Sequence, residues 1–364
     1  MADRRLVMAA PLSLSGRYAL QGRAAAAGLE QLADDVRHTG GLRLGDAVLM
    51  PELVLFDDTG TGKGVRRCLD LLSGAHLLFG PYGSDLVRAA AGWSEASGRV
   101  VWNHGGSADD VQRHPQLVSV PSPASRYLAT VLEAIAEPLP DARVVIAAGR
   151  GRFGRAAAQG ARSAAARLGM EVVAEVTPSE LSAEPGADAV LLAGSFSEDV
   201  EAVARLHRRP PVLAAVAAGL AAFGERLGER AHDVLGPSQW EEGARFRVDV
   251  GPAPAQVLRS LRARAVPSLR AAGFGAQLEY PAAQAYAAGL VALRCVEEAG
   301  GWQDDALAAA SRRLRCTTFF GRFGLGADGA QEAHEMLVVQ WSGRAKRVVW
   351  PSSQAEVPVS LGRR

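Results

Sequence analysis

The sequence reads Leu77-Leu-Phe-Gly-Pro-Tyr-Gly-Ser-Asp85 and, one helical segment later, Val100-Val-Trp-Asn-His-Gly-Gly-Ser-Ala-Asp-Asp110. Each stretch predicts a short apolar strand, a turn of small residues and the start of a helix. The first N–H groups of a helix have no intrahelical acceptor, and Ser84 and Ser107 occupy the expected N-cap positions. Two such turns at the carboxyl edge of one sheet would bind a carboxylate or carboxamide. For either turn alone, plain capping is the alternative.

The surrounding sequence alternates strands and helices. Strands are expected at Leu6–Ala10, Leu53–Phe56, His76–Phe79 and Val100–Asn103, and helices at Gln21–Arg37, Val65–Leu72 and Asp85–Ala96. A second such series follows Pro121 and ends near Gly236, and it is followed by three helices and a hairpin around Ser342-Gly-Arg344. This order predicts an α/β protein with two doubly wound, three-layer α/β/α lobes. A (β/α)₈ barrel is the alternative fold.

The expected domains follow from this order. Residues 1–121 and 241–316 form lobe 1, and residues 122–240 and 317–364 form lobe 2. The chain would then cross between the lobes three times, which would make a three-strand hinge.

Composition excludes several classes of function. The chain has 364 residues, 48% of them apolar, and a net charge of +1, so it has no global attraction to nucleic acid or to an anionic membrane. No apolar stretch is long enough for stable membrane insertion. Its three cysteines, Cys68, Cys295 and Cys316, lie far apart and have no metal-binding spacing. We therefore expect neither a metal nor a cofactor.

Both turns resemble the ligand loops of the leucine/isoleucine/valine-binding family of solute receptors. Further similarities follow in the family's order and cover nearly the whole chain: Pro11–Gly16, Phe56-Asp57-Asp58, Phe153-Gly154, Ala193–Phe196, Tyr286–Leu290, Thr317–Phe323 and the terminal hairpin. The resemblance implies a type 1 periplasmic binding protein fold whose two lobes close over a solute, and no catalysis. It also implies an ABC importer, with its permease as partner.

The same resemblance implies the site residues. Ser84, Gly105 and Ser107 would bind the carboxylate end of a ligand in the cleft between the lobes. Phe153 and Phe196 would contact it from the second lobe, and Tyr18 and Gln21 lie in the opening loop. Trp102 is expected as a wall of the site. For each aromatic residue, ordinary core packing is the alternative.

One position departs from the family's pattern. Amino-acid binders of this kind usually have an acidic residue after the strand that here ends in Ala214-Ala215, but this chain continues Val-Ala-Ala-Gly219. A buried ammonium group without a partner is costly. The ligand is therefore expected to be an aromatic or aliphatic acid, or an amide, unless Glu198 or Asp199 replaces the missing acid.

Other functions remain open. Gly149-Arg-Gly-Arg-Phe-Gly154, followed by Glu171 and Glu175, has the spacing of a dinucleotide-binding turn and makes an NAD-dependent enzyme the rival interpretation. Ser84, Asp85 and His104 are a weaker candidate for a hydrolase triad. Within the binding class, a cytoplasmic ligand sensor is the alternative to an importer subunit. We expect a cytoplasmic location if the sequence is complete, and a periplasmic or other extracytoplasmic one if a leader is missing.

Overall fold

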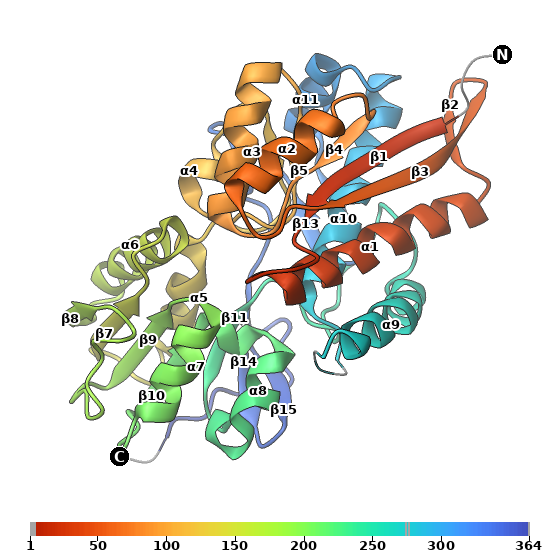
Figure 1. Ribbon diagram of the computed structural model, residues 1–364. Helices are drawn as coiled ribbons and strands as arrows, with labels where there is room; N and C mark the ends of the chain where they lie inside the picture. The colour runs from red at the N-terminus through yellow and green to blue at the C-terminus, as the bar shows by residue number, and fades with distance from the viewer. Residues whose placement is uncertain (1–4, 274, 276, 363–364) are drawn as a thin grey trace. The chain divides into compact units, whose positions relative to one another are not determined.

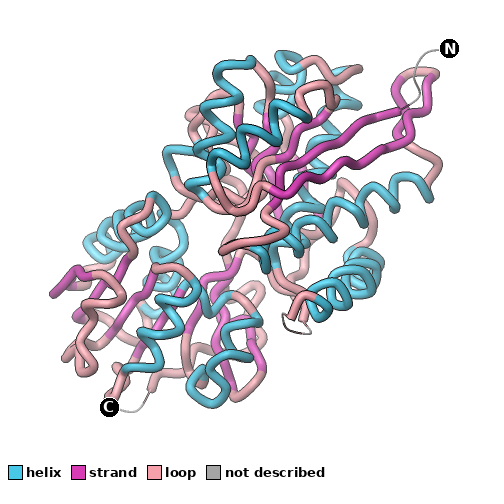
Figure 2. Tube along the Cα trace, viewed as in Figure 1, coloured by secondary structure: helices cyan, strands magenta, loops and turns pink. Residues whose placement is uncertain are grey.

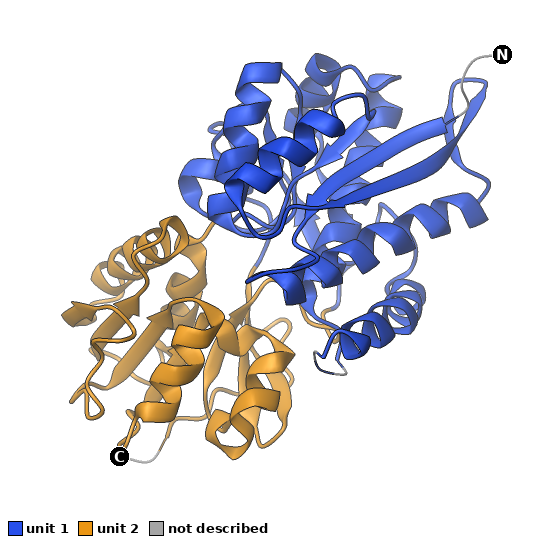
Figure 3. Ribbon diagram, viewed as in Figure 1, with its two compact units in different colours: residues 1–122, 245–335 blue, residues 123–244, 336–364 orange. Residues whose placement is uncertain are grey.

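The computed structural model describes residues 5–273, 275 and 277–362, and it divides the chain into two compact units. Unit 1 comprises residues 1–122 and 245–335, and unit 2 comprises residues 123–244 and 336–364 (Figure 3). The chain therefore passes from one unit to the other three times. Strands and helices alternate along both units (Figure 2).

The last boundary differs from our expectation, because residues 317–335 belong to unit 1. The backbone N–H of Gln331 donates to Gln112 Oε1 at 3.2 Å, and its side-chain Nε2 donates to the Val120 carbonyl, also at 3.2 Å. Arg113 and Asp328 form an ion pair of 2.6 Å. These partners are about 200 positions away, so the pattern of the segment itself does not reveal them.

Unit 1 contains a six-stranded sheet in the order β2-β3-β1-β4-β5-β6, in which β2 is antiparallel to β3 and the other pairs are parallel. Its strands are β1 (Arg5–Leu12), β2 (Leu42–Leu44), β3 (Ala47–Asp57), β4 (Leu77–Phe79), β5 (Val101–Asn103) and β6 (Leu117–Ser119). Because the parallel strands share one direction, the turns that follow β1, β3, β4 and β5 meet at one edge of the sheet.

Helices cover both faces of this sheet (Figure 1). On one face, α2 (Gly62–Leu71) and α3 (Ser84–Ser97) bury a cluster that includes Val65, Leu78 and Val101. Helices α1 (Ala19–His38), α9 (Pro254–Ala271) and α10 (Tyr280–Ala299) pack together on the other face. The unit also contains α4 (Asp109–Gln112), α11 (Asp304–Arg313) and the small hairpin β12 (Cys316–Thr318) and β13 (Gly321–Phe323).

Unit 2 contains a seven-stranded sheet in the order β15-β14-β11-β10-β9-β7-β8, in which the last two strands of the chain are antiparallel. Its strands are β7 (Arg143–Ala148), β8 (Glu171–Val176), β9 (Ala189–Ala193), β10 (Val212–Ala215), β11 (Leu235–Ser238), β14 (Leu337–Ser342) and β15 (Ala345–Trp350). The predicted hairpin around Ser342-Gly-Arg344 is therefore confirmed.

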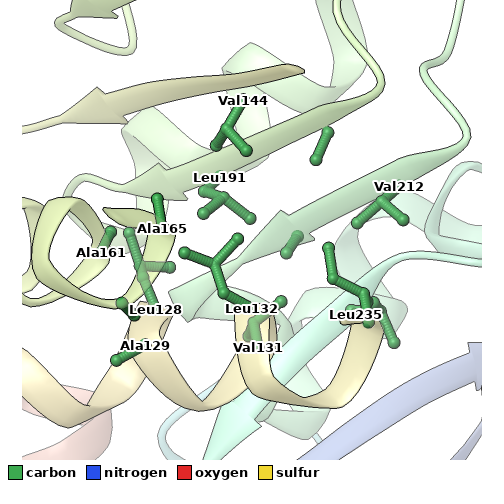
Figure 4. Packing of buried hydrophobic residues seen from close by; sticks show 14 of the residues in the cluster. Leu128, Ala129, Val131, Leu132, Val144, Ala161, Ala165, Leu191, Val212 and Leu235 are labelled. Atoms are coloured by element: carbon green, nitrogen blue, oxygen red, sulfur yellow. The ribbon is translucent and has the colours of Figure 1, made fainter. Parts of the chain in front are cut away.

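Alternate residues of the strands in unit 2 enter two different cores. Val144 and Leu191 pack against α5 (Ser125–Ile135) and α6 (Arg152–Arg167), as Figure 4 shows. Their neighbours Val145 and Val190 pack on the opposite face, against α7 (Phe196–Arg205) and α8 (Ala221–Leu227). This alternation is expected for a sheet buried on both faces, and it confirms the doubly wound α/β architecture.

Candidate functional site

The first candidate site is the carboxyl edge of the sheet in unit 1, where the turns after β4 and β5 touch. Tyr82 and Gly105 form an isolated parallel bridge, and the Gly83 N–H donates to the Gly105 carbonyl at 2.9 Å. A Cβ atom on Gly105 would lie 2.5 Å from the Tyr82 Cα. Glycine at this position is therefore what allows the two turns to approach each other.

The two serines do not cap their helices, contrary to our expectation. The N-cap of α3 is Gly83, with φ of 102°, and the N-cap of α4 is Ala108. Ser84 Oγ instead accepts the N–H of Ala108 at 3.0 Å, so this hydroxyl joins the two turns. Its own proton remains available to an acceptor. Ser107 is also buried, at 5% exposure, and is engaged within the protein.

The N–H groups of the two turns differ in their engagement. The N–H groups of Gly105 and Gly106 donate to Asn103 Oδ1 at 3.1 and 2.8 Å, so the expectation of outward-facing N–H groups is wrong for this turn. In α3, the N–H of Val87 donates to the Gly83 carbonyl. The N–H groups of the three preceding residues therefore lie before the helical ladder begins.

Tyr18 precedes α1 and contacts Gly83 at the start of α3, and Gln21 lies in the first turn of α1. A Cβ atom on Gly83 would lie 2.8 Å from the Tyr18 ring, and the Tyr18 and Tyr82 rings are edge to face, 6.1 Å apart. Burial raises the pKa of Tyr18, so its hydroxyl keeps its proton at neutral pH. Gln21 is 8% exposed, and its Oε1 has no hydrogen-bond partner among the described residues.

Three side chains at this edge were not predicted as site residues. The hydroxyls of Tyr82 and Tyr280 lie 3.1 Å apart, although Tyr280 begins α10, far along the chain. From the same helix, Gln284 Nε2 donates to the His104 carbonyl. Tyr82 lies inside the quoted turn and Tyr280 precedes Pro281 at a helix start, which are the two signals that the sequence offered.

Trp102 and His104 belong to the core. Both are fully buried. We had expected Trp102 to form a wall of the site, but its side chain packs in the core instead. Burial lowers the pKa of His104 to about 4, against the raising effect of hydrogen bonds to the backbone of Gly80 and of His104 itself. No hydrogen bond joins His104 to Ser84, so the triad hypothesis is wrong.

The second candidate site is the carboxyl edge of the sheet in unit 2. Phe153, at the start of α6, packs edge to face on Tyr127, with ring centroids 5.0 Å apart. The Tyr127 hydroxyl accepts Nε2 of Gln239 at 2.8 Å. Phe196 begins α7 and is half-buried against the adjoining core. Tyr127 and Gln239 come from a helix and a loop that the sequence analysis did not connect with this site.

The sequence analysis named Glu198 and Asp199 as possible partners for a ligand's ammonium group, and both already accept hydrogen bonds from the protein. Glu198 completes a capping box with Ser195 and accepts its N–H at 2.7 Å. Asp199 is fully buried, and its two oxygens accept the N–H groups of Gly194 at 2.7 Å and Ala217 at 3.1 Å. Burial raises the pKa of Asp199 to about 7, against the lowering effect of these two bonds.

The glycine-rich turn between β7 and α6 has a local structural role. A Cβ atom on Gly154 would overlap the Gly149 carbonyl, so this glycine lets the helix start close to the strand end. Glu175, a candidate ribose ligand, is paired with Arg162. The described residues include no group of three or more His, Cys, Asp or Glu side chains that would hold a metal ion. No helix in the described part is long and apolar enough to cross a membrane.

Comparison with known proteins reveals relatives of one kind. The chain is 35% identical over 98 residues to Leu/Ile/Val-binding protein homolog 8 of Brucella abortus, a match that spans 27% of this chain and 24% of that protein. The chain therefore spans only about a quarter of the length of this curated relative. Four curated relatives match.

Solved structures resemble almost the whole chain. The isoleucine complex of LivJ, the branched-chain amino acid transporter substrate-binding protein of Streptococcus pneumoniae, has a TM-score of 0.76 at 17% identity and covers 95% of this chain and 100% of its own. A solute-binding protein of an ABC transporter from R. palustris, in complex with benzoate, has a TM-score of 0.72 at 19% identity, with 95% of each chain covered. A putative branched-chain amino acid ABC transporter protein from Silicibacter pomeroyi has a TM-score of 0.78 at 16% identity, covering 98% and 99%.

These likenesses show the fold, which is that of the type 1 periplasmic binding proteins. The family follows from the sequence itself, since the family model described as "Periplasmic binding protein" matches residues 8–346. The chain belongs to the periplasmic binding protein family.

Proposed function

We propose that this protein binds a small carboxylate- or amide-bearing solute without catalysis, as the substrate-binding component of an ABC importer. The observation that carries the proposal is the pair of turns joined by the Ser84 hydroxyl and the Gly83–Gly105 hydrogen bond. Next to them begins α3, whose first N–H groups favour an anion or a carbonyl oxygen.

In this proposal the residues of unit 1 bind the polar end of the solute. Ser84 donates its hydroxyl proton, Gly105 lets the two turns approach each other, and Ser107 lies in the same turn as Gly105. Tyr18 is the aromatic neighbour of the turn, and its protonated hydroxyl is a further donor. From unit 2, Phe153 and Phe196 supply apolar contacts, since both rings are half-buried at the carboxyl edge of their own sheet.

The ligands of solved proteins with this fold support a carboxylate-bearing solute. The solved proteins of this fold were found with isoleucine, leucine and benzoate, each of which carries a carboxylate. An ABC permease is then the partner of this chain. The family model that matches the chain is described as a binding protein, which supports binding over catalysis.

The test is calorimetry with Ser84→Ala. Loss of one hydrogen bond to a charged group costs about 1.5–3 kcal/mol, so we expect the variant to bind about one to two powers of ten more weakly. Native mass spectrometry of gently purified protein, together with isoleucine, leucine and benzoate as probes, supplies the ligand. The matched control is Ser73→Ala, because Ser73 is exposed and bonds only locally to Asp70. Equal affinity of Ser84→Ala and the control would contradict the proposal.

A further inference from the structure

The carboxylates at the carboxyl edge of unit 2 have partners within the protein. Glu198 is held by the capping box, and Asp199 is buried between two backbone N–H groups. Glu241, which follows β11, is paired with Lys346 at 2.8 Å, and both side chains are largely buried. Glu180 accepts the N–H and the hydroxyl of Thr177. The loop after β10, residues 216–219, carries no acid.

The carboxylates at the carboxyl edge of unit 1 are similarly engaged. Asp57 accepts three backbone N–H groups and the Ser15 hydroxyl. Asp58 is fully buried and accepts Ser13 Oγ and the Gly60 N–H, each at 2.7 Å. Its other oxygen has no hydrogen-bond partner in the described part of the chain, and burial raises the pKa of Asp58, which favours the neutral form. Asp85 faces Arg17 at 3.8 Å, and Glu279, 4% exposed, is engaged as well.

Positive groups also lie at the carboxyl edge of unit 1, where the Arg17 side chain is paired with Asp85. The Arg17 guanidinium lies 4.5 Å over the Tyr18 ring, beside the start of α3, and its side chain is 59% exposed. The first N–H groups of α3 add the positive end of a helix dipole. Each acidic side chain named above has a partner within its own unit, whereas the first N–H groups of α3 in unit 1 lie before the helical ladder begins and favour an anion.

We infer that the solute is a carboxylate without an ammonium group, an aliphatic or aromatic acid and not an α-amino acid. The inference rests on the proposed function and narrows its ligand class. An α-amino acid would bring an ammonium group that must lose its water without gaining a carboxylate, which is unfavourable. The same carboxylate on a body that lacks the amine meets the same donors and avoids this cost. A neutral amide would lose the charged interaction with Arg17 and with the start of α3.

Calorimetry on the full chain with matched compounds tests this inference. The pairs are leucine with 4-methylpentanoate, phenylalanine with 3-phenylpropanoate, and benzamide with benzoate. In the two amino-acid pairs we expect the acid to bind at least about 100-fold more tightly than its partner, because an unpaired buried charge costs several kilocalories per mole. Benzoate should bind more tightly than benzamide, because the amide lacks the charge that the start of α3 favours. An amino acid that binds as tightly as its desamino analogue would overturn the inference, and so would an amide that binds better than its acid.

Two further measurements make the outcome decisive. If none of the six compounds binds, the molecule retained in native mass spectrometry decides: an acid without an amine supports the inference, and an amine-bearing molecule overturns it. If no compound binds and none is retained, it is the proposed function that fails. Should leucine or phenylalanine bind, Glu279→Gln identifies whether Glu279 is the ammonium partner. If it is, this substitution abolishes the binding of the amino acid.

Discussion

The side chains that meet at the carboxyl edge of unit 1 come from distant parts of the sequence. Ser84 and Gly105 were predictable, because small residues after a buried strand have a local signature. Tyr280 and Gln284 were not, because they reach the turns only through the packing of α10, and the Tyr82 and Tyr280 hydroxyls that meet are 198 positions apart. The hypothesis of a triad with His104 failed for a related reason. The neighbours of His104 in sequence indicate a turn, whereas the fold buries its ring completely.

The buried imidazole of His104 should make the stability of the protein depend on pH. Burial lowers its pKa from 6.5 to about 4, so the unfolded chain takes up a proton that the folded chain does not. This contribution to stability is complete above about pH 6.5 and is lost as the pH falls toward 4. At pH 5 the loss relative to pH 7.5 amounts to about 2 kcal/mol of unfolding free energy. Urea unfolding at pH 7.5 and pH 5 measures it.

In His104→Leu the pH-dependent loss of stability should shrink by about that amount, since no titrating group remains at the site. His207→Gln is the control, because His207 is exposed, and it should keep the dependence of the wild type. A His104→Leu protein that loses as much stability as the wild type between the two pH values would show that the imidazole is not the group responsible.

At the scale of helices and strands, length decides what the sequence can predict. The helices α1 and α3 and the strand β1 were expected close to their observed bounds, because their patterns extend over more residues. The strands β2, β6, β12 and β13 were missed, since each has three residues, too few for any periodicity. The equally short β4 and β5 were predicted only because a turn of small residues follows each of them. Such strands exist because a neighbouring strand offers hydrogen bonds, which is a tertiary property.

The contact between α1 and α10 depends on a glycine. A Cβ atom on Gly28 would overlap the Ala282 carbonyl of α10. Gly28→Ala should therefore push the helices apart and destabilise the protein by about 1–3 kcal/mol, even though alanine favours a helix. Gly92→Ala is the matched control in α3, where a Cβ atom meets nothing within 4 Å.

The control should stabilise the protein by about 0.5–1 kcal/mol through helix propensity alone. Thermal or urea unfolding of the two variants beside the wild type measures both effects. Changes of the same sign in the two proteins would mean that helix propensity, and not the close approach of α1 to α10, sets the outcome at Gly28.

At the scale of the whole molecule, each unit is assembled from two separate parts of the chain. The sequence predicted three crossings, because a helical block and a hairpin follow two strand–helix series. It misplaced the third, since residues 317–335 are held in unit 1 by Gln112, Arg113 and Val120. Periodicity describes segments, whereas the assignment of a segment to a unit depends on the partners that it finds.

This assembly predicts how a local defect spreads through the protein. Trp341, on β14, is 1% exposed, its Nε1 donates to the Ala218 carbonyl at 2.9 Å, and its ring packs beside Phe223. Trp341→Ala should cost about 3–5 kcal/mol, because it leaves a large cavity and an unpaired carbonyl in unit 2. Amide hydrogen exchange should then show lost protection in residues 123–244, far away in sequence, because β14 pairs with β11.

The adjoining residues 245–335 should keep their protection, since they belong to unit 1. Phe319→Ala supplies the reciprocal variant: Phe319 is 2% exposed and packs edge to face on Tyr286, within unit 1. Its effect should appear in residues 5–122 and 245–335, excluding the two undescribed positions, and spare β14 and β15. If the loss of protection instead followed distance along the sequence, so that Trp341→Ala exposed residues 300–335 and left β7 and β9 protected, the division of the chain into these two cooperative units would be wrong.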